Sequence, residues 1–91
     1  MLKKYLISFR EEGLNSNPSD SVIRRNVERL SPKTWFQIFP NFILIQSDLS
    51  ISDILAEIEF ISHSKRIVIS EISDCITNEE QVNEALKEYG Y

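Results

Sequence analysis

Four short segments rich in β-branched and aromatic residues, separated by two segments with helical periodicity, place the strongest constraint on how this chain folds. The strand-like segments cover residues 4–9, 34–39, 42–47 and 66–72. Residues of these types favour a pleated, half-buried backbone. Only Pro40-Asn41 separates the second segment from the third, which predicts a tight antiparallel hairpin.

Helical periodicity marks the two segments between the strands. Ile23, Val27 and Leu30 recur at intervals of four and three residues, which predicts an amphipathic first helix. A second helix is predicted to open at Ser50, because Ser50 and Asp53 have the spacing of a capping box.

A third helical segment follows the last strand. Thr77-Asn78-Glu79-Glu80 has the layout of a capping box and predicts a helix over residues 77–89, with Gly90 able to stop it. The order is therefore βαββαβ followed by a terminal helix, which is typical of an α+β, ferredoxin-like sandwich. We expect one domain over residues 1–91, with a core over residues 3–72.

The strands carry large apolar side chains on both sides, whereas a sheet face that is open to water shows polar residues at alternate positions. Two helices cover one face, so the other face needs a cover of its own. Either the terminal helix folds back over it, or a second copy covers it in an isologous dimer. We expect a homodimer. The residues of this dimer or helix-covered sheet face are Leu6, Phe36, Ile38, Ile43 and Ile45.

Basic residues are concentrated in the first third of the chain. The formal net charge is −4, but residues 1–33 carry seven basic and four acidic residues, whereas the rest of the chain carries three basic and ten acidic ones. A basic cluster can follow phosphates without reading base sequence. The same cluster also fits an ordinary charged outer face, and the acidic remainder of the chain favours that alternative. The candidate nucleic-acid-binding residues are Lys3, Lys4, Arg10, Arg24, Arg25 and Arg29.

No motif specifies a catalytic chemistry. Cys75 is the only cysteine, which excludes an intrachain disulfide, and its acidic neighbour Asp74 is expected to raise the pKa of the thiol. His63 is the only histidine and has no partner visible in the sequence. We therefore predict no catalytic residue, no metal and no cofactor. The single cysteine and the lack of any run of about 18 apolar residues favour a cytoplasmic protein without a membrane span.

The strand pattern resembles a known family, the SinR-like small bacterial proteins. The matching segments, in order, are Tyr5-Leu6-Ile7-Ser8-Phe9, Trp35, residues 42–46, Ser47-Asp48-Leu49-Ser50 and residues 66–71. That family is similar in fold to the CRISPR-associated adaptation subunit and to the VapD-type ribonucleases. The resemblance implies a ferredoxin-like fold, a homodimer and a link to nucleic acids or phage defence.

Nuclease members of that broader group place an aspartate at the end of the first strand, where a symmetric dimer shares a divalent metal. This chain has Phe9-Arg10 there, and an arginine supplies no metal ligand and repels a cation. Glu11 and Glu12 follow as possible substitutes, but a loop position favours solvated side chains. The sequence therefore argues against metal-dependent nuclease activity.

We expect a non-catalytic, homodimeric interaction module in a nucleic-acid-associated or phage-defence system. The first alternative is a divergent metal-dependent nuclease of the CRISPR adaptation-subunit type. The second is a regulator that binds another protein through its acidic C-terminal helix, on which Glu80, Glu84 and Glu88 share one side. The expected partners are a second copy, another protein or a nucleic acid.

Overall fold

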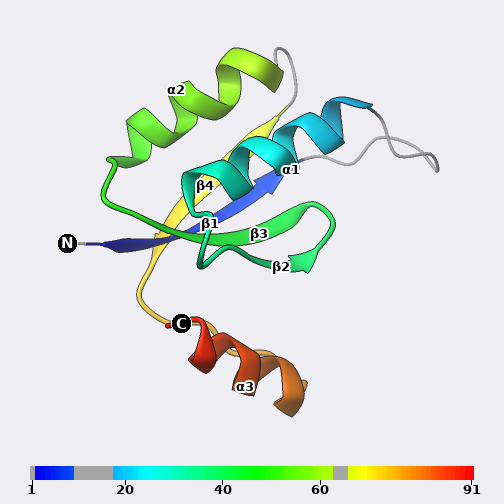
Figure 1. Ribbon diagram of the computed structural model, residues 1–91, viewed down its shortest axis with the longest axis vertical. Coiled ribbons are helices and arrows are strands. Elements are labelled where there is room, and N and C mark those ends of the chain that lie inside the picture. The colour runs from blue at the N-terminus through cyan, green and yellow to red at the C-terminus, as the bar shows by residue number, and fades with distance from the viewer. Residues whose placement is uncertain (1, 10–17, 63–65) are drawn as a thin grey trace.

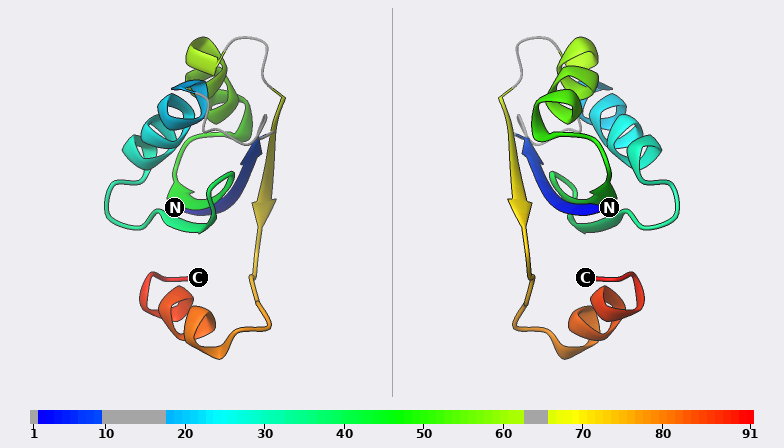
Figure 2. Two further views of the ribbon diagram at one scale, coloured as in Figure 1. Left: turned by 90° about the vertical axis from the view of Figure 1, so that its right-hand side faces the viewer. Right: turned by 90° about the vertical axis from the view of Figure 1, so that its left-hand side faces the viewer.

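The computed structural model describes residues 2–9, 18–62 and 66–91, and within them it has the predicted order of strands and helices (Figure 1). The elements are β1 (Lys3–Phe9), α1 (Pro18–Leu30), β2 (Phe36–Phe39), β3 (Phe42–Ser47), α2 (Ile51–Ser62), β4 (Ile67–Ile72) and α3 (Glu80–Glu88). The fold is α+β, with α1 and α2 on one side of an antiparallel sheet and α3 on the other (Figures 1 and 2).

Most element boundaries agree with the sequence pattern, and two differ for a local reason. β2 begins at Phe36 rather than at residue 34, because the chain first makes a turn in which Trp35 N–H donates to Ser31 O at 2.9 Å. α3 begins at Glu80 rather than at residue 77, because Thr77 bonds to a side chain of the helix instead of capping it. The Ser50 cap is confirmed, since Asp53 N–H donates to Ser50 Oγ at 3.2 Å.

The four strands lie in the order β2-β3-β1-β4, so β2 and β4 form the two edges of the sheet. β1 is central and pairs antiparallel with both β3 and β4, and β2 pairs antiparallel with β3. The register places Tyr5 opposite Ile45 and Ile7 opposite Ile43. Directly opposite residues of antiparallel strands share a face, so these four side chains lie together.

The first face of the sheet, which α1 and α2 cover, holds the main core. Its buried side chains are Tyr5, Ile7 and Phe9 of β1, Ile43 and Ile45 of β3, Ile23 and Val27 of α1, and Ile54 and Ile58 of α2. The prediction that Ile43 and Ile45 lie on the opposite face is wrong. Alternation along a strand separates its two sets of side chains, but only the register with β1 shows which set faces the helices.

The second face carries Leu6, Leu44 and Phe36, because the register places Leu44 opposite both Leu6 and Phe36. Leu44 is fully buried there, and Leu86 of α3 is the buried residue of that helix. Ile38, also expected on this face, is half-buried within the register shift between Gln37 and Phe39.

Three contacts hold α3 against the β2–β3 half of the second face. Gln46 Nε2 donates to Tyr89 O at 2.9 Å, and Tyr91 Oη donates to Thr34 O at 2.8 Å. The rings of Phe36 and Tyr89 meet edge-to-face with their centroids 5.4 Å apart. These contacts leave the β4 half less covered, where Val68 remains 53% exposed.

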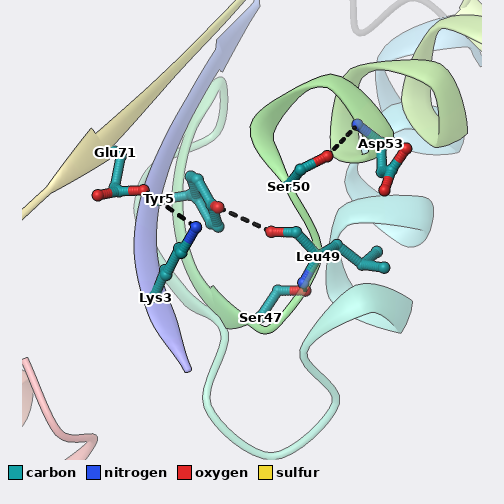
Figure 3. A network of polar contacts seen from close by, with 7 residues as sticks. All are labelled: Lys3, Tyr5, Ser47, Leu49, Ser50, Asp53 and Glu71. Atoms are coloured by element: carbon teal, nitrogen blue, oxygen red, sulfur yellow. Dashed lines mark hydrogen bonds and ion pairs between the residues drawn. The ribbon is translucent and has the colours of Figure 1, made fainter. Parts of the chain in front are cut away.

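A polar network secures the start of α2 to the first face (Figure 3). Tyr5 Oη, from a fully buried side chain, donates to Leu49 O at 2.7 Å. Leu49 N–H donates to Ser47 Oγ at 3.1 Å, and Lys3 Nζ lies 3.9 Å from a carboxylate oxygen of Glu71.

None of the helices in the described ranges has both the length and the apolar character needed to cross a bilayer.

Candidate protein-docking site

A groove of about 440 Å³ lies beside the second face, between the β2–β3 hairpin and the segment that joins β4 to α3. The hairpin contributes Phe36, Gln37, Ile38, Phe39 and Phe42, and the other wall comprises Cys75, Ile76, Thr77, Asn78, Glu79 and Val82. Glu79 is the one charged residue of this lining. The groove is therefore mainly apolar, with a polar and acidic margin where α3 begins.

The hairpin wall is aromatic and firmly held at its tip. The rings of Phe39 and Phe42 meet edge-to-face with their centroids 5.8 Å apart. Asn41 fixes the turn, because Asn41 Nδ2 donates to Phe9 O at 3.1 Å and Phe9 N–H donates to Asn41 O at 3.2 Å. The register shift in β2 accompanies this arrangement, and Phe39 stays 59% exposed at the margin of the groove.

The opposite wall is shaped by reciprocal hydrogen bonds between Thr77 and Asn83. Thr77 N–H donates to Asn83 Oδ1 at 2.8 Å, and Asn83 Nδ2 donates to Thr77 O at 3.0 Å. Glu79 N–H then donates to Thr77 Oγ1 at 3.1 Å. The segment is thereby fixed to the first turns of α3, and Ile76 projects outward with 85% of its surface exposed.

Two large apolar side chains are thus exposed at the margins of one apolar groove. A single exposed apolar residue is ordinary on a protein surface and needs no explanation. Exposed apolar residues grouped around a concave apolar surface with a polar rim are typical of a binding site for another protein. Phe39 and Ile76 therefore make this groove the best candidate site among the described residues.

Sequence reasoning did not find this groove, because its two walls come from residues 36–42 and 75–82, which only the fold brings together. No protein-family model, curated protein or solved structure matches the chain. One available signal was Ile76, an apolar residue outside the predicted strands and immediately before the expected helix. Such a position gives it no obvious place in the core.

Cys75 lies in the groove wall but is poorly suited to nucleophilic chemistry. Burial of the thiol raises its pKa, and the neighbouring Asp74 carboxylate raises it further. Asp74 itself is held in place, since one of its oxygens accepts a hydrogen bond from Cys75 N–H at 2.9 Å. The expected influence of Asp74 is confirmed, with burial as the larger cause, and the thiol stays protonated at neutral pH.

The basic residues proposed for nucleic-acid binding are divided by the fold. Lys3 and Lys4 point to opposite faces of β1, and Lys3 is paired with Glu71. Arg24 Nη1 donates to Pro40 O at 3.4 Å, whereas Arg25 and Arg29 are exposed on α1. Lys4 shares the second face with Gln46, on the side of the sheet away from α1.

Four candidate residues from the sequence lie outside the described residues, namely Arg10, Glu11, Glu12 and His63. Within the described ranges, no group of three or more His, Cys, Asp or Glu side chains is placed to hold a metal ion. The acidic side of α3 is exposed, namely Glu80, Glu84 and Glu88.

Proposed function

We propose that this chain is a homodimeric, non-catalytic interaction module that presents its apolar groove to a partner protein. The observation that carries the proposal is the exposure of Phe39 and Ile76 at the margins of that groove. Complete burial of an apolar side chain of this size contributes about 1.5–3 kcal/mol. Two such residues beside a groove provide a compact source of binding energy, in the manner of interface hot spots.

The ferredoxin-like assignment belongs to the same proposal. Read from the β4 edge, the strand order is β4-β1-β3-β2, and the chain order is βαββαβ before α3. Both support a split βαβ arrangement. We also propose that the chain is related to the SinR-like family, that it is cytoplasmic, and that it acts in a nucleic-acid-associated or phage-defence system.

The charge around the groove indicates which partner segment would fit. Glu79 lines the groove and Glu80 follows it at the start of α3. Glu84 and Glu88 are also exposed on that helix and outnumber its one exposed basic residue, Lys87. Complementary charge across an interface speeds association and selects among partners. The partner segment is therefore one that carries large apolar side chains flanked by lysine or arginine. The alternative function, a regulator that binds another protein through its acidic helix, would use the same kind of partner segment.

A peptide-display selection against the purified protein tests the groove directly. We expect the selected peptides to combine a large apolar side chain with a nearby lysine or arginine. Phe39→Asp or Ile76→Asp should weaken binding of a labelled selected peptide about tenfold or more in fluorescence anisotropy, since each removes one hot-spot contact. Leu55→Asp is the matched control, because Leu55 is 38% exposed on α2, across the sheet from the groove.

Unchanged affinity in the Phe39→Asp and Ile76→Asp variants would overturn the groove as the docking surface.

The proposal that the chain has no catalytic activity is tested by incubation with labelled RNA and DNA in the presence of magnesium or manganese. Cleavage that disappears in Glu11→Ala or Glu12→Ala would contradict it and favour the divergent nuclease.

A further inference from the structure

We infer that two copies of this chain pair through β4, antiparallel and about a two-fold axis at Ser70, so that the four-stranded sheet continues from one copy into the other. The inference rests on the homodimer of the proposed function and names the surface that forms it. It concerns the β4 edge of the sheet, whereas the groove lies beside β2 at the opposite edge.

The two edge strands differ in how well they are protected against the addition of another strand. β2 is four residues long, has a register shift between Gln37 and Phe39, and is followed by Pro40. Short length, bulges and proline are the usual means of blocking an edge. β4 has none of these features, because its six residues pair with β1 in an unbroken register and include neither proline nor lysine.

Backbone directions show which groups of β4 face outward. Phe9 N–H donates to Asn41 O, so the backbone N–H and C=O groups of Phe9 point toward β3. These groups alternate in direction along a strand, so those of Ser8 and Leu6 point toward β4. The backbone groups of their partners, Val68 and Ser70, therefore point toward β1. It follows that the N–H and C=O groups of Ile67, Ile69 and Glu71 point away from the sheet, ready to pair with an added strand.

The sequence of β4 is complementary to itself when two copies meet at Ser70. Ile69 then lies opposite Glu71 of the second copy, and each exchanges both backbone hydrogen bonds with the other. On the second face, exposed Val68 lies opposite Ile72 of the second copy and forms an apolar cross-strand pair. The two-fold axis repeats each pair.

Charge also favours this register. Continued beyond the strand ends and the bend at Ser73, this register brings Arg66, which precedes β4, opposite Asp74 of the second copy, and both side chains are exposed. No two like charges face each other, because Glu71 lies opposite an isoleucine. Moving the axis to Ile69 would place Arg66 opposite Ile72 and Val68 opposite Ser70, which loses both the charge pair and the apolar pair.

The arrangement of layers leaves room for a second copy. β4 forms one outer margin of the sheet in both views of Figure 2, and no helix of the described residues lies beyond it. A two-fold axis perpendicular to the sheet keeps α1 and α2 of both copies on one side. It places α3 and the groove of both copies on the other side.

Proline substitutions at the two edges form a matched test. Glu71→Pro removes an outward N–H without removing a bond to β1, and an edge strand tolerates proline there. We expect it to raise the dimer dissociation constant about tenfold or more in sedimentation velocity, while circular dichroism shows a folded chain. Gln37→Pro is the control, because Gln37 is the outward residue of β2 by the same alternation, and should leave the dissociation constant within about twofold.

Charge exchange gives a second test that does not depend on proline. Arg66→Asp and Asp74→Arg should each weaken the homodimer, because each puts like charges opposite each other. An equimolar mixture of the two variants should form a heterodimer, and the double variant Arg66→Asp/Asp74→Arg should regain the wild-type dissociation constant. Single variants that dimerise like the wild type, with no heterodimer preference, would overturn the inference.

The results of these tests distinguish failure of the pairing through β4 from failure of the homodimer itself. A wild-type chain that is monomeric at about 100 μM, a concentration that populates even weak dimers, would end the homodimer proposal and this inference together. A wild-type dimer that survives Glu71→Pro and the charge changes, but dissociates in Phe39→Asp, would retain the homodimer and move it to the groove. Peptide binding in the groove stands independently of either result.

Discussion

Tyr91 illustrates how a single side chain can secure a whole layer. Its hydroxyl donates to Thr34 O at 2.8 Å, which joins the segment that follows α3 to the turn before β2. Burial raises the pKa of the Tyr91 phenol, and an interaction with the side chain of Thr34 offsets part of that rise. The fold therefore favours the neutral phenol.

The sign of the resulting pH dependence follows from the raised pKa. A tyrosine whose folded-state pKa is above its unfolded value contributes stability below the ordinary tyrosine pKa of about 10, and that stability is lost as the pH rises further. We expect wild-type stability, measured by urea unfolding, to fall more steeply above pH 10 than that of Tyr91→Phe. Parallel curves for the two proteins between pH 9 and about pH 11.5 would contradict this role.

At the scale of elements, α3 ends in a way that its sequence dictates. Tyr91 N–H donates to Leu86 O at 2.8 Å and Gly90 N–H donates to Lys87 O at 3.1 Å, which together form a Schellman motif. Gly90 has a φ of +94°, a conformation that costs other residues energy. A Cβ at this position would also lie 2.9 Å from Gln46 Nε2, which itself holds Tyr89 O.

Gly90→Ala should therefore loosen α3 more than the rest of the molecule. We expect a loss of about 1 kcal/mol, because both the positive φ and the Gln46 contact oppose a Cβ. The measurement is hydrogen exchange, in which amides of α3 should lose protection while those of β1 and β3 keep theirs. Equal protection of α3 in the variant and the wild type would count against this account of the helix end.

The sequence predicted elements better than it predicted contacts between them. The hairpin around Pro40-Asn41 and the Ser50 cap are local features, and both are present in the structure. The faces of Ile43 and Ile45 were wrong, because alternation is a property of one strand whereas the shared face depends on pairing with another. The start of α3 was wrong because Thr77 bonds to Asn83, six residues away, which a capping pattern does not contain.

The candidate site depended even more on tertiary structure. In the sequence Phe39 belongs to a predicted strand, and Ile76 stands out only as an apolar residue outside the strands. The strand order puts β2 and β4 at opposite edges, and the hairpin meets the β4–α3 segment only because that segment passes below the second face. The basic cluster showed the opposite failure, since residues close in sequence, Lys3 and Lys4, separate to opposite faces. Composition and charge cannot resolve either case, because both describe residues without their directions.

For the whole molecule, stability is concentrated in the layer between the sheet and the helices α1 and α2. Ile58 is fully buried there, whereas Leu55 on the same helix is 38% exposed. We expect Ile58→Ala to lower the free energy of unfolding by about 2–5 kcal/mol, through lost burial and the cavity that remains. Urea unfolding followed by the fluorescence of Trp35, which packs against this core, provides the measurement.

Leu55→Ala is the matched control on the same helix, and it should change the free energy of unfolding by less than about 1 kcal/mol. A similar loss in both variants would contradict this account, because the buried and the exposed position of α2 would then contribute alike. Because domains of this kind have only about 5–15 kcal/mol of stability, the expected loss in Ile58→Ala is a large share of the total.

The position of the groove at the β2 edge, opposite β4, sets a distance once two sheets are joined. Seven strand spacings then separate β2 from its counterpart, which at about 4.8 Å each is roughly 34 Å. A chain that fills both grooves at once must bridge that gap, which takes about ten residues at 3.3 Å each. Such a bridged ligand gains avidity over either half alone, whereas two motifs joined by a shorter tether bind only one at a time.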